Sequence, residues 1–209
     1  MPMSEPAELF VLVADRDIEQ TVLGLLARTH ALAIRSIQSA KVRPFARHDG
    51  GCRVEGVALL RALRGQFRHS LLIFDHEGSG ADTTTVELEN LLQEDLCKSG
   101  WGDNAAVILI DPEIEAWVWA ESKHVDRILG WSEDGSLRSW LQSNNYIKPG
   151  QQKPVDPKAA MLAALKHKAK KPSSSIFRQL ADSVSFKGCT DRSFNKLTST
   201  LQRWFPPSE

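Results

Sequence analysis

Four short segments that predict β-strands are separated, over the first 121 residues, by stretches with the period of an amphipathic helix. The four segments are 9–14, 32–36, 70–74 and 105–110. Between the first two, Ile18, Val22 and Leu25 share one helical face, and Thr84 with Glu87 has the spacing of a capping box at the start of a later helix. Strands that alternate with helices favour an α/β fold, with a mostly parallel sheet of about four strands and helices on both faces.

From residue 122 the pattern changes, because the sequence predicts no further strand there. Apolar residues at helical spacing instead predict helices around 161–165, 176–180 and 194–204. We therefore expect two parts: an α/β domain over residues 1–121 and a helical C-terminal extension over 122–209 that packs on it.

The charges are divided unevenly between the two ends of the chain. The 209 residues carry no formal net charge, but residues 151–209 hold 11 Lys and Arg against 4 Asp and Glu. An acidic body with a basic tail is typical of proteins that act on polyanions, although a few lysines can also simply keep an exposed helix in water. Three scattered cysteines, no apolar run of about 20 residues and no signal peptide indicate a soluble cytoplasmic protein without a membrane segment.

Acidic residues follow three of the four predicted strands. Parallel strands joined by right-handed crossovers have their carboxyl ends at one edge of the sheet, where ligands of α/β proteins bind. The residues that could meet there are Asp15, Asp17 and Glu19 after the first strand, Asp75 and Glu77 after the third, and Asp111, Glu113 and Glu115 after the fourth. Such a cluster needs a cation to offset its repulsion, and Mg²⁺ or Mn²⁺ suits an all-oxygen site that acts on phosphate groups.

Each of these acids also has a structural interpretation. Asp111 is a suitable N-cap, with Pro112 at the first position of the following helix, and Glu113 suits the positive end of that helix dipole. Asp17 and Glu19 fall in a first helical turn for the same reason. Asp75 and Glu77 are harder to explain as caps, since they directly follow a buried strand.

Three motifs resemble Toprim-like proteins. They are VLVADRDIE at 11–19, LIFDHE at 72–77 and IEAW at 114–117. The last is similar to a Glu-x-Trp segment of the RloB-like, defence-associated members, which include small proteins encoded with bacterial methylation-associated defence systems. The resemblance implies a Toprim-like fold and a Mg²⁺-dependent nuclease of antiphage defence.

The resemblance also implies roles for individual residues. Asp15 would take the place of the family's catalytic glutamate, with Glu19 as a nearby second acid. Asp75 and Glu77 would hold the metal, and Glu115 would complete the site. The chain departs from the family pattern in having the shorter Asp15 instead of glutamate, and arginine instead of the usual glycine at position 16.

Two functions of different classes follow from these observations. In the first, the protein is a metal-dependent nuclease or other phosphoryl-transfer enzyme, and four lysines attract the backbone of DNA or RNA: Lys166, Lys168, Lys170 and Lys171. In the second, it is a catalytically inactive Toprim-like subunit whose acidic edge docks a partner protein of the same defence system. The sequence leaves open the choice of DNA or RNA, the partner subunits and the oligomeric state.

Overall fold

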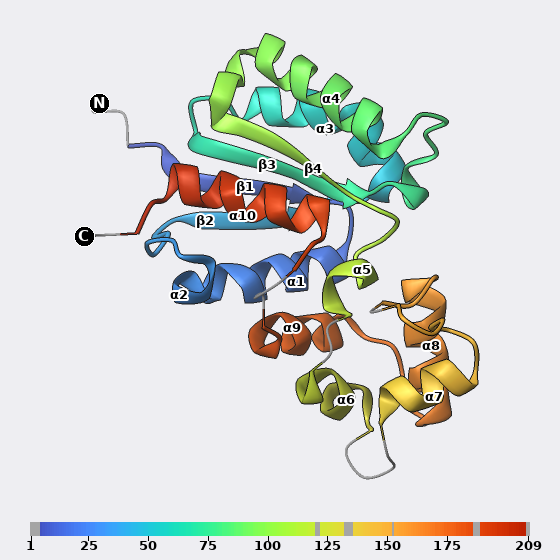
Figure 1. Cartoon of the computed structure of the whole chain (residues 1–209). Helices are drawn as coiled ribbons and strands as arrows, with labels where there is room; N and C mark the ends of the chain where they lie inside the picture. The colour runs from blue at the N-terminus through green and yellow to red at the C-terminus, as the bar shows by residue number, and fades with distance from the viewer. Residues whose placement is uncertain (1–4, 120–121, 132–135, 152, 186–188, 208–209) are drawn as a thin grey trace.

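The protein is an α/β structure built on one sheet, as Figure 1 shows. The computed structural model describes residues 5–119, 122–131, 136–151, 153–185 and 189–207. Four strands form the sheet in the order β2-β1-β3-β4, and all neighbours are parallel. The strands are β1 (Ala7–Val13), β2 (Ala40–Pro44), β3 (Phe67–Asp75) and β4 (Ala105–Ile110). The predicted four-stranded parallel α/β class is thus confirmed.

Helices cover both faces of the sheet. Figure 1 shows α3 and α4 on one face and α1 with α10 on the other. The helices of the first part are α1 (Arg16–Ala27), α2 (Thr29–Leu32), α3 (His48–Ala62), α4 (Thr85–Leu96) and α5 (Glu115–Val118), with short helical turns at Glu77–Ser79, Cys97–Trp101 and Gly102–Asn104. The α4 capping box forms as predicted, because the Thr84 and Glu87 side chains each accept from the other's backbone N–H.

The second strand lies elsewhere than the sequence predicts. Residues 32–36 are not a strand, since α2 ends at Leu32 and Ala33 adopts a left-handed conformation with φ 53°. Leu32 and Ile34 are buried, which explains their alternation with polar neighbours. The true β2 is a sheet edge whose residues are mostly exposed, so it carries little apolar signal.

Asp111 does not begin a helix, contrary to the sequence prediction. The Asp111–Pro112 peptide is cis, and α5 starts only at Glu115 with Ile114 as its N-cap. The Asp111 carboxylate instead accepts a hydrogen bond from Thr85 Oγ1 at 2.9 Å, which connects the end of β4 to the first turn of α4.

The C-terminal extension contains the three predicted helices and two more. They are α6 (Lys123–Leu129), α7 (Leu137–Ser143), α8 (Pro157–His167), α9 (Ser174–Ser183) and α10 (Arg192–Trp204). Helix α9 packs along α1, and α10 returns to the sheet beside β4. Two buried tryptophans hold the extension to α5: Trp117 Nε1 donates to Ser193 Oγ, and Trp119 Nε1 donates to the Pro157 carbonyl, both at 2.8 Å.

Side chains from α4 and α10 close the outer edge of β4. The Gln93 amide bonds the Ala105 carbonyl and the Val107 N–H, both at 3.0 Å. Glu89 accepts the Leu109 N–H at 2.9 Å, and Arg192 donates to the Leu109 carbonyl at 3.3 Å. These side chains take the hydrogen bonds that a fifth strand would make, so this edge is protected from pairing with another chain.

No helix in the described part of the chain is both long and apolar enough to cross a membrane.

Candidate functional site

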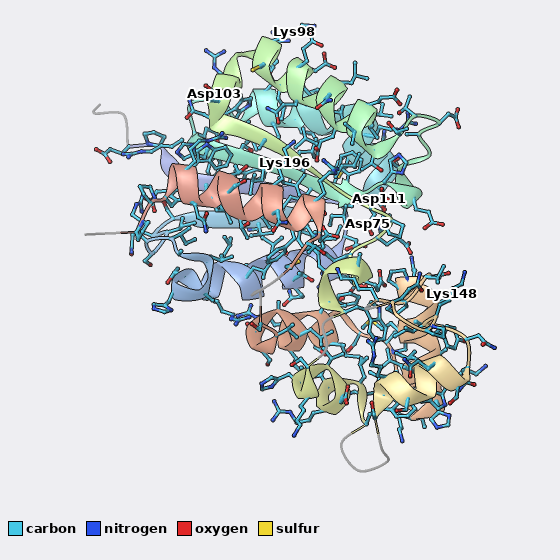
Figure 2. The ribbon with its side chains drawn as sticks, viewed as in Figure 1. Asp75, Lys98, Asp103, Asp111, Lys148 and Lys196 are labelled. Atoms are coloured by element: carbon cyan, nitrogen blue, oxygen red, sulfur yellow. The ribbon has the colours of Figure 1, made fainter. Side chains whose placement is uncertain are left out.

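The carboxyl ends of β1, β3 and β4 meet at one edge of the sheet, as the parallel topology requires. Asp15, Asp75 and Asp111 directly follow or end these strands. In Figure 2, Asp75 and Asp111 lie at the same end of the sheet, whereas Asp103 lies at the other end. We call this end of the sheet, with Asp15, Asp49, Asp75 and Glu115, the acidic edge.

Asp75 is the most buried carboxylate of the acidic edge. It ends β3 with a relative exposure of 6%, and its Oδ1 is a buried atom without a hydrogen-bond partner in the described part of the chain. Burial raises the pKa of Asp75 well above its ordinary value, and the charges of Asp49, Asp15 and Glu115 raise it further. A hydrogen bond from the Ile114 backbone opposes that rise. Asp75 is therefore a carboxyl group held in a place that disfavours its negative charge.

Asp49 is a member of the acidic edge that the sequence analysis missed. It lies in the first turn of α3, and its Oδ1 accepts the backbone N–H of Asp75 at 2.8 Å. A Cβ atom on Gly78 would lie 2.5 Å from Asp49 Oδ2, so only glycine lets the turn after β3 pass so close. Burial raises the pKa of Asp49, and the charge of Asp15 adds to that rise.

The location of β2 explains why Asp49 was missed. The sequence analysis placed the second strand at 32–36, which left Asp49 in a loop with no relation to the sheet. With β2 at Ala40–Pro44, Asp49 lies five residues after a strand end, the same distance as Glu115 from the end of β4. The signal that could have found it is an acid shortly after an edge strand.

Asp15 and Asp17 have distinct tasks at the start of α1. Asp15 is the N-cap, and its Oδ1 accepts from the backbone N–H groups of Asp17 and Ile18, each at 2.9 Å. Burial raises the pKa of Asp17, with a contribution from the Asp15 charge, while a hydrogen bond from Ser174 of α9 and the charge of Lys158 lower it. The cap fixes the Asp15 carboxylate in place, so its charge acts on the acidic edge from a set position.

Glu115 is the member of the acidic edge that follows β4. It begins α5 with a relative exposure of 7%, and burial raises its pKa to about 7. Its own backbone N–H and Lys158 lower that pKa, while Glu113 and Asp17 raise it. A carboxyl group with a pKa near 7 can both accept and donate a proton at neutral pH, which suits general acid–base chemistry.

Lys158 is the cation that the C-terminal extension contributes. It lies in the first turn of α8, where its Nζ forms an ion pair with Glu113. The charges of Glu113, Glu115 and Asp75 all raise the pKa of Lys158, which places the ammonium group within the field of the acidic edge. Sequence reasoning missed it because it weighed only the denser lysine run further along the chain.

Two predicted acids lie at the margin of the acidic edge. Glu77 is exposed in the turn after β3, and its backbone N–H donates to the Pro112 carbonyl at 3.3 Å. Glu19 is half-buried in α1, one turn after Asp15. The acids whose charges raise the pKa of Asp75 are Asp49, Asp15 and Glu115. Roles for Glu19 and Glu77 stay predictions.

The four predicted nucleic-acid-binding lysines lie at the far end of α8 from Lys158. Lys170 Nζ donates to the Ile128 carbonyl, and Lys168 Nζ lies 4.4 Å from the centre of a Trp131 ring. Lys166 and Lys171 are exposed. Because an 11-residue helix is roughly 16 Å long, this run is well separated from the acidic edge.

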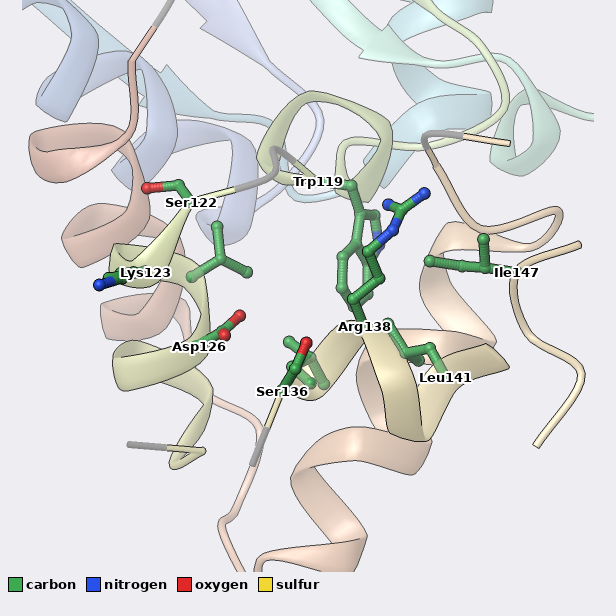
Figure 3. Close-up of a pocket in the computed structure, with 10 residues that line it drawn as sticks. Trp119, Ser122, Lys123, Asp126, Ser136, Arg138, Leu141 and Ile147 are labelled. Carbon is green, nitrogen blue, oxygen red and sulfur yellow. The ribbon is translucent and has the colours of Figure 1, made fainter. Parts of the chain in front are cut away.

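Two hollows lie near these elements. One of about 370 Å³ opens at the carboxyl end of β4, between the first turns of α4 and α10, and Thr85, Asp111 and Arg192 are among the residues that line it. The other, of about 200 Å³, lies beneath Trp119 between α6 and α7, and Figure 3 shows Asp126 and Arg138 on its walls. The first adjoins the acidic edge and offers room there for a ligand. The second lies between Trp119 and the C-terminal extension.

The acidic edge offers the type of donor atom that a hard divalent cation prefers. They are carboxylate oxygens, and one of them, Asp75 Oδ1, is buried and open to a further partner. Within the described ranges, however, no three His, Cys, Asp or Glu side chains are gathered closely enough to hold a metal ion. The donors therefore suit Mg²⁺ or Mn²⁺ in kind, but Asp75, Asp49 and Glu115 do not lie close enough together in this structure to form a metal site.

Comparison with protein-family models, curated proteins and solved structures finds no match to this chain. The resemblance to Toprim-like proteins therefore depends on the motifs at 11–19, 72–77 and 114–117.

Proposed function

We propose that this protein is a Toprim-like phosphoryl-transfer enzyme that uses Mg²⁺ or Mn²⁺ at the acidic edge to act on nucleic acid, in a bacterial antiphage defence system. The observation that carries the proposal is the buried Asp75 carboxyl group, whose Oδ1 is without a partner among the described residues. Structural carboxylates that are this deeply buried are paired with cations or hydrogen-bond donors. A buried carboxyl group that keeps one oxygen unpaired among the described residues, as Asp75 does, is a candidate for chemistry.

The charges around Asp75 support a cation as its ligand. Asp49, Asp15 and Glu115 all disfavour the ionised form of Asp75, so a bound divalent cation would lower the free energy of the whole group. When bound, such an ion polarises a phosphate oxygen and activates water. Asp75, Asp49 and Glu115 would hold it after moving closer together than they lie in this structure, and the proton now favoured on Asp75 would have to leave on binding.

The remaining groups support action on an anionic substrate. Lys158 offers a positive charge beside Glu113 and Glu115, where it can bind a phosphate group once the substrate competes for it. Glu115 can take up or release a proton at neutral pH because burial places its pKa at about 7. Asp15, fixed by its capping hydrogen bonds, would take the role that the resemblance gives to the family's catalytic glutamate.

Metal titration tests the proposal most directly. Calorimetry of Mn²⁺ and Mg²⁺ into EDTA-treated protein should show binding that the Asp75→Asn variant loses. The matched control is Asp103→Asn, since Asp103 is exposed at the opposite end of the sheet (Figure 2). Binding that survives in Asp75→Asn would refute the site, and binding lost equally in both variants would show that the effect is not local.

Cleavage assays then test the activity. The wild-type protein should cut DNA or RNA only with added Mg²⁺ or Mn²⁺, and Asp75→Asn should abolish that cleavage. Glu77→Gln and Glu19→Gln decide the two marginal acids, because each should lower cleavage only if its carboxylate takes part. A folded protein that binds neither metal at millimolar concentration would favour the inactive subunit that docks a partner protein.

A further inference from the structure

An array of aromatic rings lies at the end of the C-terminal extension remote from the acidic edge. Trp131 stacks on His167 with ring centres 5.1 Å apart and an interplanar angle of 16°. Trp140 stacks on Tyr146 at 5.9 Å and 18°, and it lies 5.0 Å from His167 and 5.1 Å from Trp131. Rings from α7, from the loop after it and from the end of α8 thus form one continuous group.

Only part of this aromatic array is buried in the core of the C-terminal extension. Trp131 is 3% exposed and forms its buried base. Trp140 and Tyr146 are half-buried, and His167 is exposed. A cluster needed only for packing would bury its rings more completely, so the outer members are available to a flat ligand.

Positive charge surrounds the same rings. Residues 136–171 contain eight Lys and Arg and a single acid, Asp156. Lys166 and Lys171 are exposed there, at and just beyond the end of α8. Lys170 donates to the Ile128 carbonyl, and Lys168 Nζ lies 4.4 Å from the centre of a Trp131 ring, contacts that leave both ammonium charges in place. The surface is therefore both aromatic and strongly basic.

We infer that this aromatic–basic surface, formed by Trp140, Tyr146, Lys166, His167 and Lys171, binds single-stranded nucleic acid. Single strands expose bases that stack on aromatic side chains, while lysines follow the phosphates. A duplex hides its base faces and would use the lysines alone. An anionic membrane would likewise use the lysines without stacking on the exposed His167 ring.

The position of α8 connects this surface to the acidic edge. Lys158 lies in the first turn of α8 beside Glu113, and Lys166 and His167 lie in its last turn, roughly 13 Å further along the helix. A strand held on the surface and running along α8 would reach the acidic edge. In this sense the inference rests on the proposed function and specifies its substrate as single-stranded, although the binding itself requires no metal.

Fluorescence anisotropy with a labelled oligothymidine in EDTA tests the charges. Lys166→Gln/Lys171→Gln should weaken binding by roughly tenfold at 0.1 M salt and lower the slope of log affinity against log salt by about 1.4. The matched control is Lys41→Gln/Lys98→Gln, which removes two exposed lysines from β2 and the end of α4. Equal losses in both pairs would overturn the assignment of this surface.

The rings are tested by variants of His167. His167→Ala should weaken oligothymidine binding by about tenfold, while His167→Phe, which keeps a stacking ring, should bind as the wild type does. Binding should also quench tryptophan fluorescence, because Trp140 belongs to the surface. Tighter binding of a duplex than of the single strand, or binding of anionic vesicles without the oligonucleotide, would overturn the inference.

The experiments distinguish a failure of the proposed enzyme from a failure of the proposed strand-binding surface. Asp75→Asn should bind oligothymidine in EDTA as tightly as the wild type does. If metal binding is absent but this surface still binds the strand, the proposed enzyme is wrong and the surface stands. If metal-dependent cleavage is present but Lys166→Gln/Lys171→Gln binds the strand normally, the surface is wrong and the acidic edge stands.

Discussion

Two buried acids of similar exposure, Glu89 and Asp75, differ completely in their partners. Glu89, 3% exposed at the outer edge of β4, accepts the Leu109 N–H at 2.9 Å and forms ion pairs with Arg192 at 2.5 Å and Lys196 at 3.0 Å. Asp75, 6% exposed at the acidic edge, has one oxygen with no hydrogen-bond partner in the described part of the chain and other acids around it.

Glu89 therefore stabilises the fold, whereas the buried charge of Asp75 lowers the stability of the folded protein. Glu89 closes a sheet edge and joins α4 to α10, and each of its partners depends on it in turn. Nothing comparable depends on the negative charge of Asp75. Burial alone therefore does not indicate a functional site, whereas burial without compensation does.

Removing Glu89 should give the largest loss of stability. Glu89→Ala leaves the Leu109 N–H without its acceptor and takes the ion-pair partner from Arg192 and Lys196. We expect the free energy of unfolding to fall by about 4 kcal/mol, measured by urea denaturation. Glu94→Ala, an exposed acid on the same helix, should change it far less. If the two variants lower the free energy of unfolding by similar amounts, Glu89 has no special structural role and its contrast with Asp75 is wrong.

The second largest effect that we expect is a dependence of the free energy of unfolding on pH, caused by the acidic edge. A carboxyl group whose pKa is raised on folding holds its proton in the folded protein after the unfolded chain has lost it, so stability falls as pH rises through that interval. For Glu115 the interval runs from about 4.5 to about 7, which corresponds to about 3 kcal/mol. Asp17, Asp49 and Asp75 act in the same direction.

Urea denaturation in EDTA between pH 4.5 and 8 measures this loss. Glu115→Gln should flatten the profile, because glutamine carries no proton to lose. A wild-type stability that rises steadily over the same range would contradict the raised pKa of Glu115.

Asp75→Asn should stabilise the metal-free protein, opposite in sign to Glu89→Ala. The amide can still accept from the Ile114 backbone but carries no charge to bury. We expect a gain of about 1–2 kcal/mol at pH 8 that shrinks as the pH falls toward 3.8, the ordinary pKa of aspartate, because the unfolded chain then takes up the proton as well. Asp103→Asn should show no such gain. A loss of stability in Asp75→Asn at pH 8 would mean that its charge is compensated, as that of Glu89 is.

Sequence and structure agree on what local patterns determine. Three of the four strands, the parallel sheet and the α4 capping box follow from apolar runs, crossovers and the Thr84–Glu87 spacing. The structure also brings Asp15, Asp75 and Glu115 to one edge, because parallel strands leave no other arrangement of their ends.

What the sequence could not provide depends on contacts between distant segments. β2 is an exposed edge strand without an apolar pattern, and its misplacement concealed Asp49. Lys158 reaches the acidic edge from α8, where Trp119 of a distant segment donates a hydrogen bond to the neighbouring Pro157 carbonyl. The array of Trp131, Trp140 and His167 joins three segments that no local spacing connects.

The smallest effect tests whether Asp49 acts through its oxygen or its charge. Asp49→Asn keeps an acceptor for the Asp75 N–H while removing a charge that raises the pKa of Asp75. Asp49→Ala removes both and leaves that N–H unsatisfied, so it should be less stable than Asp49→Asn by about 1 kcal/mol in urea denaturation. Gly78→Ala offers an independent disturbance, since its methyl group would displace the Asp49 carboxylate. If Asp49→Asn and Asp49→Ala are equally stable, the hydrogen bond does not position Asp75, and Asp49 contributes to the acidic edge by its charge alone.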